Sequence, residues 1–378
     1  MTLIYSKAVG AKQPAVHVFV IGVGNYPYLE KGSKKTFRPN GGLGQLGSPV
    51  ASAQVFCQWL QQEFRPRKLE LGSIEVLCSE GGTFEDATGK FRTVAAPTMA
   101  NVRKAADMWM ARGSAHEDNL LIFYFCGHGV STGVVHSLLL EDFGKHKNDP
   151  FTTGAIDANA FMDGIRGAAA NSQLFLLDAC RKVSHTEFNN YGNVRGAPII
   201  SAVANTRLGV VEQAALWATS LGQLAYGVPN QPSVFMSAML HAMQGGGALQ
   251  DSDDGKWVIQ PDVLKRAIDH IVQRQPEFAH SELQFASLER MSKGIAVHML
   301  DGEPSVPVKV NCIPTSRNIH TEFQCSSGAK RKSGTPTPWH LDLTCNRYTF
   351  RAIEGKAKKI KSALALPPYA VVTFDCTK

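Results

Sequence analysis

Two stretches of the chain end a run of strand-forming apolar residues on a side chain that can do chemistry. Residues 123–130 read FYFCGHGV and reach His128, and residues 172–180 read SQLFLLDAC and reach Cys180. If the two runs are neighbouring parallel strands, both side chains lie at the carboxyl edge of one sheet, where open sheets bind their ligands. An adjacent imidazole can convert a thiol to the nucleophilic thiolate. The two stretches therefore predict nucleophilic catalysis by Cys180, with His128 as its base.

Glycines on both sides of His128 support this interpretation. Glycine weakens the interior of a strand, so Gly127 and Gly129 suit a place where a substrate carbonyl approaches the backbone and the Gly129 amide faces it. Taken singly, the histidine could simply end a strand and Cys180 could be a buried small residue, but the pair on successive strand ends favours catalysis. A metal site formed by Cys126, His128 and Cys180 lacks an identifiable fourth ligand, and we expect neither a metal nor a cofactor.

The residues two positions before the pair should share its strand faces, because alternate side chains of a strand point the same way. Cys126 is then expected beside His128, and Asp178 beside Cys180. A buried carboxylate without a partner is costly, so we expect Asp178 to bind a cationic group of the substrate. A salt bridge or a backbone donor within the protein is the alternative.

The motifs YFCGHG and LLDAC, with the histidine about 50 residues before the cysteine, resemble those of the caspase and metacaspase-like cysteine peptidases. The resemblance continues through LWATSLGQLAYG (216–227), which is similar to the family's substrate-flanking strand, and SVFMSAMLHAMQGGG (233–247), which is similar to the helix after it. It implies a caspase fold and hydrolysis of peptide bonds by a Cys180–His128 dyad.

The same resemblance implies roles for further residues. The backbone amides of Gly129 and Cys180 would form an oxyanion hole, which stabilises the charge that develops on the substrate carbonyl oxygen. Trp217 and Ala218, in the substrate-flanking stretch, would contact the substrate.

A resemblance to metacaspases in particular implies cleavage after Arg or Lys, with Asp178 in the pocket for that side chain. Animal caspases instead have Gln in a QAC motif and cleave after Asp. One departure is that metacaspases often carry a further Asp in the helix after the first loop, where this chain has SPVASA (48–53). The choice between Arg and Lys therefore stays open, with Arg favoured for its bidentate geometry.

The polar, glycine-rich stretch RKVSHTEFNNYGNVRGAPII (181–200) predicts a loop in which proteolysis concentrates. Caspase relatives carry a processed linker at this place. A basic-specific enzyme would cut itself after Arg195, with the GAKRKSG loop (328–334) as the second choice. An intact single-chain enzyme is the alternative.

Alternating strand-like and helix-like runs over the first 300 residues must position these side chains. Apolar runs predict strands at 17–24, 73–78, 119–127, 172–180, 197–204 and 214–220. Amphipathic runs predict helices at 48–64, 96–113, 157–166, 232–244 and 260–274. This alternation predicts an α/β fold, with a caspase-like, mostly parallel sheet flanked by helices.

Composition narrows the class of protein. Hydrophobic residues make up 44% and charged residues 19% of the 378 residues, as in an ordinary globular protein. No secretory signal or run of 18 apolar residues is present, so we expect no membrane partner. Eight cysteines without CxxC pairs indicate a reducing compartment, hence a cytoplasmic protein.

A GxGxxG motif lies at Gly42, Gly44 and Gly47. A dinucleotide-binding motif would directly follow a strand, and this one does not. We therefore interpret the loop as a wall of another site and not as a nucleotide site.

The residues after Gly302 differ from the rest in charge and in pattern. The whole net charge of +7 lies at 303–378, which has 12 Lys or Arg against 5 Asp or Glu, while 27 of each sign precede it. The short alternating runs VPVKVNC, TEFQC, WHLDLTC and AVVTFDC, broken by Pro and Gly, predict strands of a small β-sandwich-like domain at 303–378, after a caspase-like domain at 1–300. Its four cysteines lack the close spacing of zinc ligands and are expected to be buried small hydrophobes.

Two functions from different classes remain open. The first is an endopeptidase, whose partners would be protein substrates with exposed Arg or Lys and an upstream activating protease or regulator. Prokaryotic members of the family often act in antiviral or cell-death systems, some linked to CRISPR signalling, and this resemblance alone suggests a self-processing effector. The alternative is a non-catalytic caspase-like scaffold whose basic tail binds nucleic acid or another anion. Because the tail lacks regularly interleaved aromatic residues, we expect no nucleic-acid partner.

Overall fold

A computed structural model describes residues 1–7, 13–34, 43–79, 82–132, 135–146, 153–180, 195–200, 211–220, 230–274, 284–290 and 294–377. By its internal contacts the chain divides into two compact units, residues 1–237 with 282–295 and residues 238–281 with 296–378. The division falls inside helix α4 (Val234–His241). The domain boundary predicted near Gly302 stays a prediction. None of the described helices is both long enough and apolar enough to cross a membrane.

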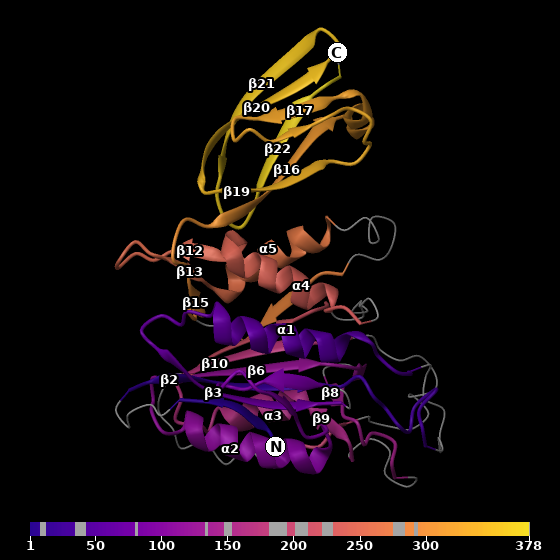
Figure 1. Ribbon diagram of the computed structural model, residues 1–378, viewed down its shortest axis with the longest axis vertical. Helices are drawn as coiled ribbons and strands as arrows, with labels where there is room; N and C mark the ends of the chain where they lie inside the picture. The colour runs from indigo at the N-terminus through magenta and orange to yellow at the C-terminus, as the bar shows by residue number, and fades with distance from the viewer. Residues whose placement is uncertain are drawn as a thin grey trace. The chain divides into compact units, whose positions relative to one another are not determined.

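The centre of the first unit is a seven-stranded sheet in the order β1-β3-β2-β6-β10-β11-β14 (Figure 1). Its strands are Leu3–Ser6 (β1), Ala15–Gly22 (β2), Glu70–Cys78 (β3), Leu120–Cys126 (β6), Ser172–Asp178 (β10), Glu212–Trp217 (β11) and Ser287–Glu289 (β14). The five inner strands run parallel and only the two edge strands are antiparallel. The predicted mostly parallel α/β sheet is confirmed.

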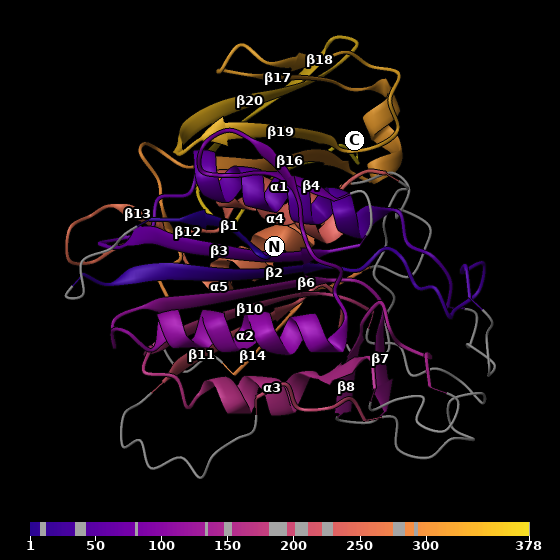
Figure 2. The same ribbon diagram turned by 60° about the horizontal axis from the view of Figure 1, so that its bottom comes forward.

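Helices cover both faces of this sheet, as Figures 1 and 2 show. Helix α1 (Ser48–Gln62) lies on one face, and helices α2 (Met99–Gly113) and α3 (Ala158–Ile165) lie on the other. Every residue of β2 and β6 is buried, which explains why these strands read as continuous apolar runs. Phe123 of β6 packs against the rings of Trp109 and Phe161, at centroid distances of 6.3 and 5.0 Å.

The first unit also contains two smaller sheets. They contain β4 (Thr83–Glu85) with β5 (Phe91–Thr93), and β7 (Gly129–Thr132) with β8 (Val135–Leu139) and β9 (Ala155–Asp157). The predicted strand at 197–204 differs in its described part, because Ala197 makes only an isolated bridge to Ile156. The Ala197 amide donates to Ala155 O at 2.8 Å. Of this predicted strand, residues 201–204 lie outside the described residues, and the described part, 197–200, bonds to β9 and adds no strand to the main sheet.

The second unit combines a helical part with a β-sandwich. Its helical part contains the π-helical turn η2 (Ala242–Gly246), helix α5 (Pro261–Val272) and a sheet of β12 (Ala248–Gln250), β13 (Trp257–Ile259) and β15 (His298–Met299). Asp342 ties this part to the sandwich, because His241 and Arg274 both lie 3.1 Å from its carboxylate.

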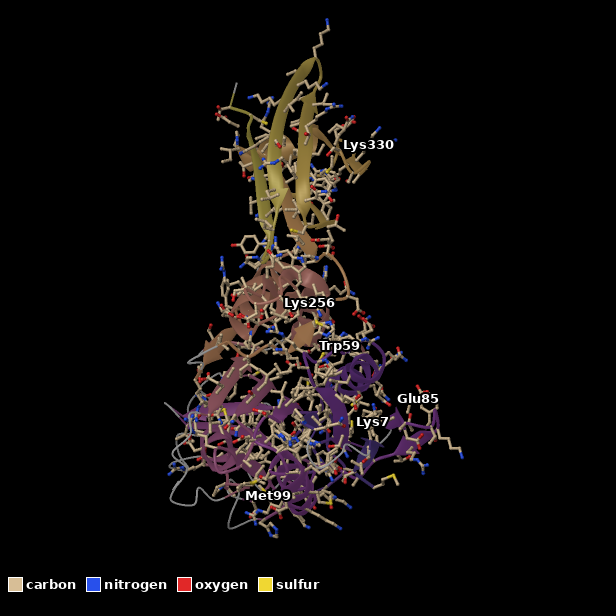
Figure 3. All side chains as sticks on the ribbon, turned by 90° about the vertical axis from the view of Figure 1, so that its left-hand side faces the viewer. Lys7, Trp59, Glu85, Met99, Lys256 and Lys330 are labelled. Carbon is tan, nitrogen blue, oxygen red and sulfur yellow. The ribbon has the colours of Figure 1, made fainter. Side chains whose placement is uncertain are left out.

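The two sheets of the sandwich confirm the predicted β-rich fold of the tail. One contains β19 (Trp339–Thr344), β16 (Ser305–Ile313) and β22 (Ala370–Asp375), and the other contains β18 (Lys330–Arg331), β17 (Glu322–Cys325), β20 (Asn346–Glu354) and β21 (Ala357–Ala365). A short 3-10 helix, η4 (Thr315–His320), follows β16. Cys312, Cys325 and Cys376 are buried, as expected, whereas Cys345 is partly exposed. Lys330, labelled in Figure 3, is exposed on β18.

Candidate active site

The carboxyl ends of β6 and β10 bring the two predicted stretches together. The strands are parallel neighbours, and Cys126 lies opposite Asp178 in their register. Beyond this pair the Gly127 amide donates to the Asp178 carbonyl at 3.3 Å. A Cβ on Gly129 would lie 2.4 Å from the Cys180 carbonyl oxygen. The backbone on either side of the predicted histidine therefore contacts the backbone that leads to the predicted cysteine.

His128 is held in a defined tautomer. Its Nε2 lies 2.8 Å from the Gly44 carbonyl oxygen, which can only accept a hydrogen bond, so Nε2 carries the proton. Burial lowers the pKa of His128 below its ordinary value, which favours the neutral ring. In that ring Nδ1 is the atom with a free lone pair, and it can act as a base toward a thiol.

Cys180 lies two residues beyond the end of β10 and is partly exposed. None of the eight cysteines forms a disulfide, and the others in the first unit, Cys57, Cys78 and Cys126, are buried. A nucleophilic thiol must be accessible, so Cys180 is the cysteine of this unit that suits the role. In the part of the chain that the structure describes, no group of three or more His, Cys, Asp or Glu side chains is arranged to hold a metal ion.

Gly129 begins β7 with its amide directed away from β8. The Leu139 amide donates to the His128 carbonyl at 2.9 Å, which makes these two residues a hydrogen-bonded pair of the ladder. Hydrogen-bonded and non-hydrogen-bonded pairs alternate along an antiparallel ladder, so Gly129, opposite Leu138, belongs to a non-hydrogen-bonded pair. This orientation is compatible with a donor to a substrate oxygen, and the oxyanion role stays a prediction.

Asp178 lies in a buried cluster of uncharged partners. Its side chain is 3% exposed, and its Oδ2 accepts hydrogen bonds from the Tyr124 hydroxyl at 3.1 Å and from the Ser233 hydroxyl. Burial raises the pKa of Asp178 to about 6, although hydrogen bonds from Ser233, Cys126 and Tyr124 oppose the shift. Within the described ranges no Lys, Arg or His forms an ion pair with this carboxylate.

Two serines from distant parts of the sequence complete this cluster. The Ser233 hydroxyl accepts from the Met236 amide at 2.9 Å, so it also caps the first turn of α4. The Ser233 amide donates to the Ser52 hydroxyl at 2.9 Å. Ser52 lies in the SPVASA segment of α1 and hydrogen-bonds with Cys126. The segment therefore places a hydroxyl beside the Asp178 cluster.

The two residues of the substrate-flanking stretch that were predicted to contact the substrate, Trp217 and Ala218, are both buried. Trp217 is 1% exposed and packs against His136 at a ring distance of 5.1 Å. Both backbone groups of Ala218 are paired, its amide with Leu177 O and its carbonyl with the Gln284 side chain, each at 2.9 Å. Their predicted contacts with substrate stay predictions.

Arg195 lies at the surface and is held by an ion pair. Its side chain is 67% exposed, and its Nε lies 2.9 Å from Oδ2 of Asp157, the residue that caps α3. A Cβ on Gly196 would lie 2.3 Å from the Ile156 carbonyl carbon, so the next residue packs tightly on β9. The rest of the predicted processing loop, residues 181–194, lies outside the described residues.

Sequence reasoning missed two residues that contact His128. Gly44 belongs to the loop that was expected to form the wall of a site, but its contact with the imidazole was not predicted. Tyr26 lies against the imidazole at a ring distance of 4.7 Å and accepts a hydrogen bond from the His128 amide at 2.8 Å. Both residues follow the carboxyl end of β2, the same edge of the sheet that identified His128 and Cys180, and this position was the available signal.

Comparison with known protein families identifies the family of this chain. Residues 19–255 match the family described as the caspase domain, and this segment includes His128, Asp178 and Cys180. The uncharacterised protein y4kE of Sinorhizobium fredii is 25% identical over 246 residues, which cover 65% of this chain and 70% of that protein. The crystal structure of caspase-1 from Spodoptera frugiperda superposes with a TM-score of 0.42 and 11% identity, over 76% of this chain and 92% of the other.

Proposed function

The chain belongs to the caspase-domain family, and from this premise we propose that it is a cysteine endopeptidase that cleaves after basic residues. One observation carries the proposal. A histidine whose tautomer is set by the Gly44 carbonyl follows β6, and the neighbouring strand β10 leads into the partly exposed Cys180. A base with a free Nδ1 and an accessible thiol are the two groups that nucleophilic cleavage of a peptide bond needs.

The proposed reaction follows from these positions. The Cys180 thiol gives its proton to Nδ1 of His128, and the thiolate attacks the substrate carbonyl carbon. The backbone amides of Gly129 and Cys180 donate to the oxyanion that forms. The imidazolium then protonates the leaving amine, which departs as the acyl-thioester forms. Water, deprotonated by His128, hydrolyses the thioester and restores the thiol.

The preference for basic residues rests on Asp178. Its described partners are uncharged hydroxyl and thiol groups, and a pKa of about 6 leaves the carboxylate ionised at neutral pH. A substrate guanidinium or ammonium group would supply the missing positive charge. Arg is favoured over Lys because its planar fork can bond a carboxylate through two donors.

A panel of fluorogenic peptides that vary the residue before the scissile bond tests the proposal. The wild type should cleave after Arg and Lys and leave Asp and Ala peptides intact. Cys180→Ala and His128→Ala should each lower kcat/KM by at least about a thousandfold. Cys345→Ala, at the other partly exposed cysteine, is the matched control and should cleave normally. Turnover by purified Cys180→Ala protein, or a wild-type preference for Asp, would contradict the proposal.

Self-processing after Arg195 is a finer part of the same proposal. Cleavage there requires the ion pair between Arg195 and Asp157 to open, so processing should be slower than cleavage of a free peptide. Mass spectrometry of active wild type beside Cys180→Ala protein tests it, with fragments ending at Arg195 expected only in the wild type. An active enzyme that stays full-length would contradict self-processing and support the single-chain alternative.

As the biological role of the protein we propose an effector in a prokaryotic immune or cell-death pathway, acting on protein substrates with exposed Arg or Lys.

A further inference from the structure

The hydroxyl of Tyr26 interrupts the backbone ladder at His128. Leu139 donates its amide to the His128 carbonyl, and the usual return bond of such a pair would run from the His128 amide to the Leu139 carbonyl. Instead the His128 amide donates to the Tyr26 hydroxyl at 2.8 Å, and that hydroxyl donates to the Leu139 carbonyl at 3.3 Å. A side-chain oxygen from the loop after β2 therefore takes the place of one ladder bond.

The environment of this hydroxyl leaves it little freedom. Tyr26 is completely buried, and burial raises the pKa of its phenol well above the ordinary value, so the group stays protonated and keeps its donor. A Cβ on Gly127 would lie 2.8 Å from the Tyr26 hydroxyl. Gly127 is thus a glycine in contact with the phenol, which gives this residue a second role beside the substrate access expected from the sequence.

The loop that holds the imidazole also holds the phenol. Gly44 accepts from Nε2 of His128, and the next residue, Gln45, bonds both backbone groups of Tyr26. Its Oε1 accepts from the Tyr26 amide at 2.8 Å, and its Nε2 donates to the Tyr26 carbonyl at 3.0 Å. The contacts therefore form a closed ring that runs through His128, Gly44, Gln45 and Tyr26. It fixes both Nε2 of the imidazole and the backbone amide of His128.

We propose that Tyr26 is a positioning residue for the imidazole of His128. Its hydroxyl sets the distance of the His128 backbone from β8, and its ring, at 44° to the imidazole, limits rotation of the imidazole plane. The pair of constraints directs Nδ1 away from Gly44 and keeps it available to the Cys180 thiol. This inference rests on the proposed peptidase function, but it concerns the reactivity of the thiol, which can be measured without any substrate.

The test is the variant Tyr26→Phe, which keeps the ring and removes the oxygen. The rate at which iodoacetamide alkylates Cys180, followed by mass spectrometry of the peptide that contains it, should fall about tenfold to a hundredfold at pH 7, the effect of losing one well-placed buried hydrogen bond. The pH dependence of alkylation should shift toward that of an ordinary thiol. His128→Ala should give the same profile, and Tyr28→Phe, which removes the hydroxyl of the next tyrosine in the chain, should match the wild type.

A second variant keeps the inference testable if Tyr26→Phe does not fold. Gln45→Ala, at an exposed residue, removes the two bonds to the backbone of Tyr26 and one to the Glu30 carbonyl, but keeps the Tyr26 hydroxyl. It should slow alkylation several-fold. Combined with Tyr26→Phe it should add less than its separate effect, because both act through one side chain. A folded Tyr26→Phe protein with the wild-type alkylation profile would overturn the inference, as would full additivity of the two changes. If the wild type cleaves no peptide but its Cys180 alkylation depends on His128 and Tyr26, the proposed function fails and the positioning role stands.

Discussion

Two buried carboxylates in the same sheet have opposite kinds of partner. Glu75 in β3 is fully buried and forms an ion pair with Arg112 from the last turn of α2. Asp178 in β10 is 3% exposed and its described partners are neutral. The first carboxylate has its counter-charge within the protein, whereas the second has, among the residues that the structure describes, polar donors that orient it and no cation that neutralises it. This difference supports a structural role for Glu75 and the proposed substrate-binding role of Asp178.

The surroundings of Glu75 support its structural role. Arg112 also donates to the Ser73 hydroxyl at 3.1 Å, and the same hydroxyl lies 2.9 Å from Nδ1 of His17. The carbonyl of His17 accepts from the Trp109 indole at 2.8 Å. This network joins α2 to β2 and β3 through the protein's own groups, and His17 and Ser73 lie in the amino-terminal halves of these strands, away from the carboxyl edge that leads to Cys180. We therefore expect it to determine stability and not specificity.

The largest effect expected from this comparison is on stability. Arg112→Met removes the cation and leaves the Glu75 carboxylate buried without it, which should lower the free energy of unfolding by about 3–5 kcal/mol. Urea denaturation measures the change. The preference among peptide substrates should stay that of the wild type.

The double variant Arg112→Met with Glu75→Gln serves as the control. It removes the buried charge together with its partner, so most of the lost stability should return. If Arg112→Met unfolds at the same urea concentration as the wild type, the ion pair does not support the fold and the comparison between the two carboxylates fails.

A smaller effect, on activity, is expected at the other carboxylate. Asp178→Asn keeps the shape and removes the charge, so cleavage after Arg and Lys should lose about 2–4 kcal/mol of transition-state binding, which is tens- to several-hundred-fold in kcat/KM. The fluorogenic peptide panel measures this loss. Glu75→Gln is the matched carboxylate-to-amide control and should keep the wild-type preference. Equal losses in the two variants would show that burial, and not position beside Cys180, determines the effect.

The same comparison shows what sequence can and cannot predict here. Asp178, Cys180 and His128 could be located because each lies at or just beyond the end of an apolar strand, and such ends meet at one edge of a parallel sheet. Ser233 could not be assigned to Asp178, because their contact depends on how the chain returns to β10 more than 50 residues later. The position of Tyr26 could have been flagged by the same rule, but its contact with the backbone of His128 depends on the ladder between β7 and β8.

The sandwich shows a different limit. Strands β16 and β22 alternate clearly and were predicted, because one face of each is packed in the core. The hairpin of β20 and β21 was not predicted. Eight of the nine residues of β21 are exposed or only partly buried, so its sequence AKKIKSALA carries no alternating pattern. A strand that buries almost nothing leaves little trace in the hydrophobic periodicity.

The smallest expected effect concerns the pH dependence of stability. On acidification the Asp178 cluster should gain stability, whereas the network around Glu75, which includes His17, should lose it. Burial raises the pKa of Asp178 to about 6 and, together with the charge of Arg112, lowers the pKa of His17 to about 4. A raised carboxyl pKa adds stability at low pH that is lost as the pH rises through about 6. A lowered imidazole pKa adds stability above pH 6.5 that is lost as the pH falls toward about 4. Each contribution is on the order of 3 kcal/mol, and over pH 4–6 the two oppose each other.

Two variants should therefore change the slope of the free energy of unfolding against pH in opposite directions. Asp178→Asn removes the group that gains stability on acidification, so between pH 6 and 4 it should lose stability faster than the wild type. His17→Gln removes a group that loses stability on acidification, so it should lose stability more slowly. Thermal unfolding across this pH range measures both slopes. Burial also lowers the pKa values of His270 and His340, but their contribution is the same in each variant and in the wild type, so it cancels when the slopes are compared. If both variants changed the slope of stability against pH in the same direction, Asp178 and His17 would titrate alike. The contrast between the Glu75 network, which includes its own cation, and Asp178, which has neutral partners, would then no longer hold.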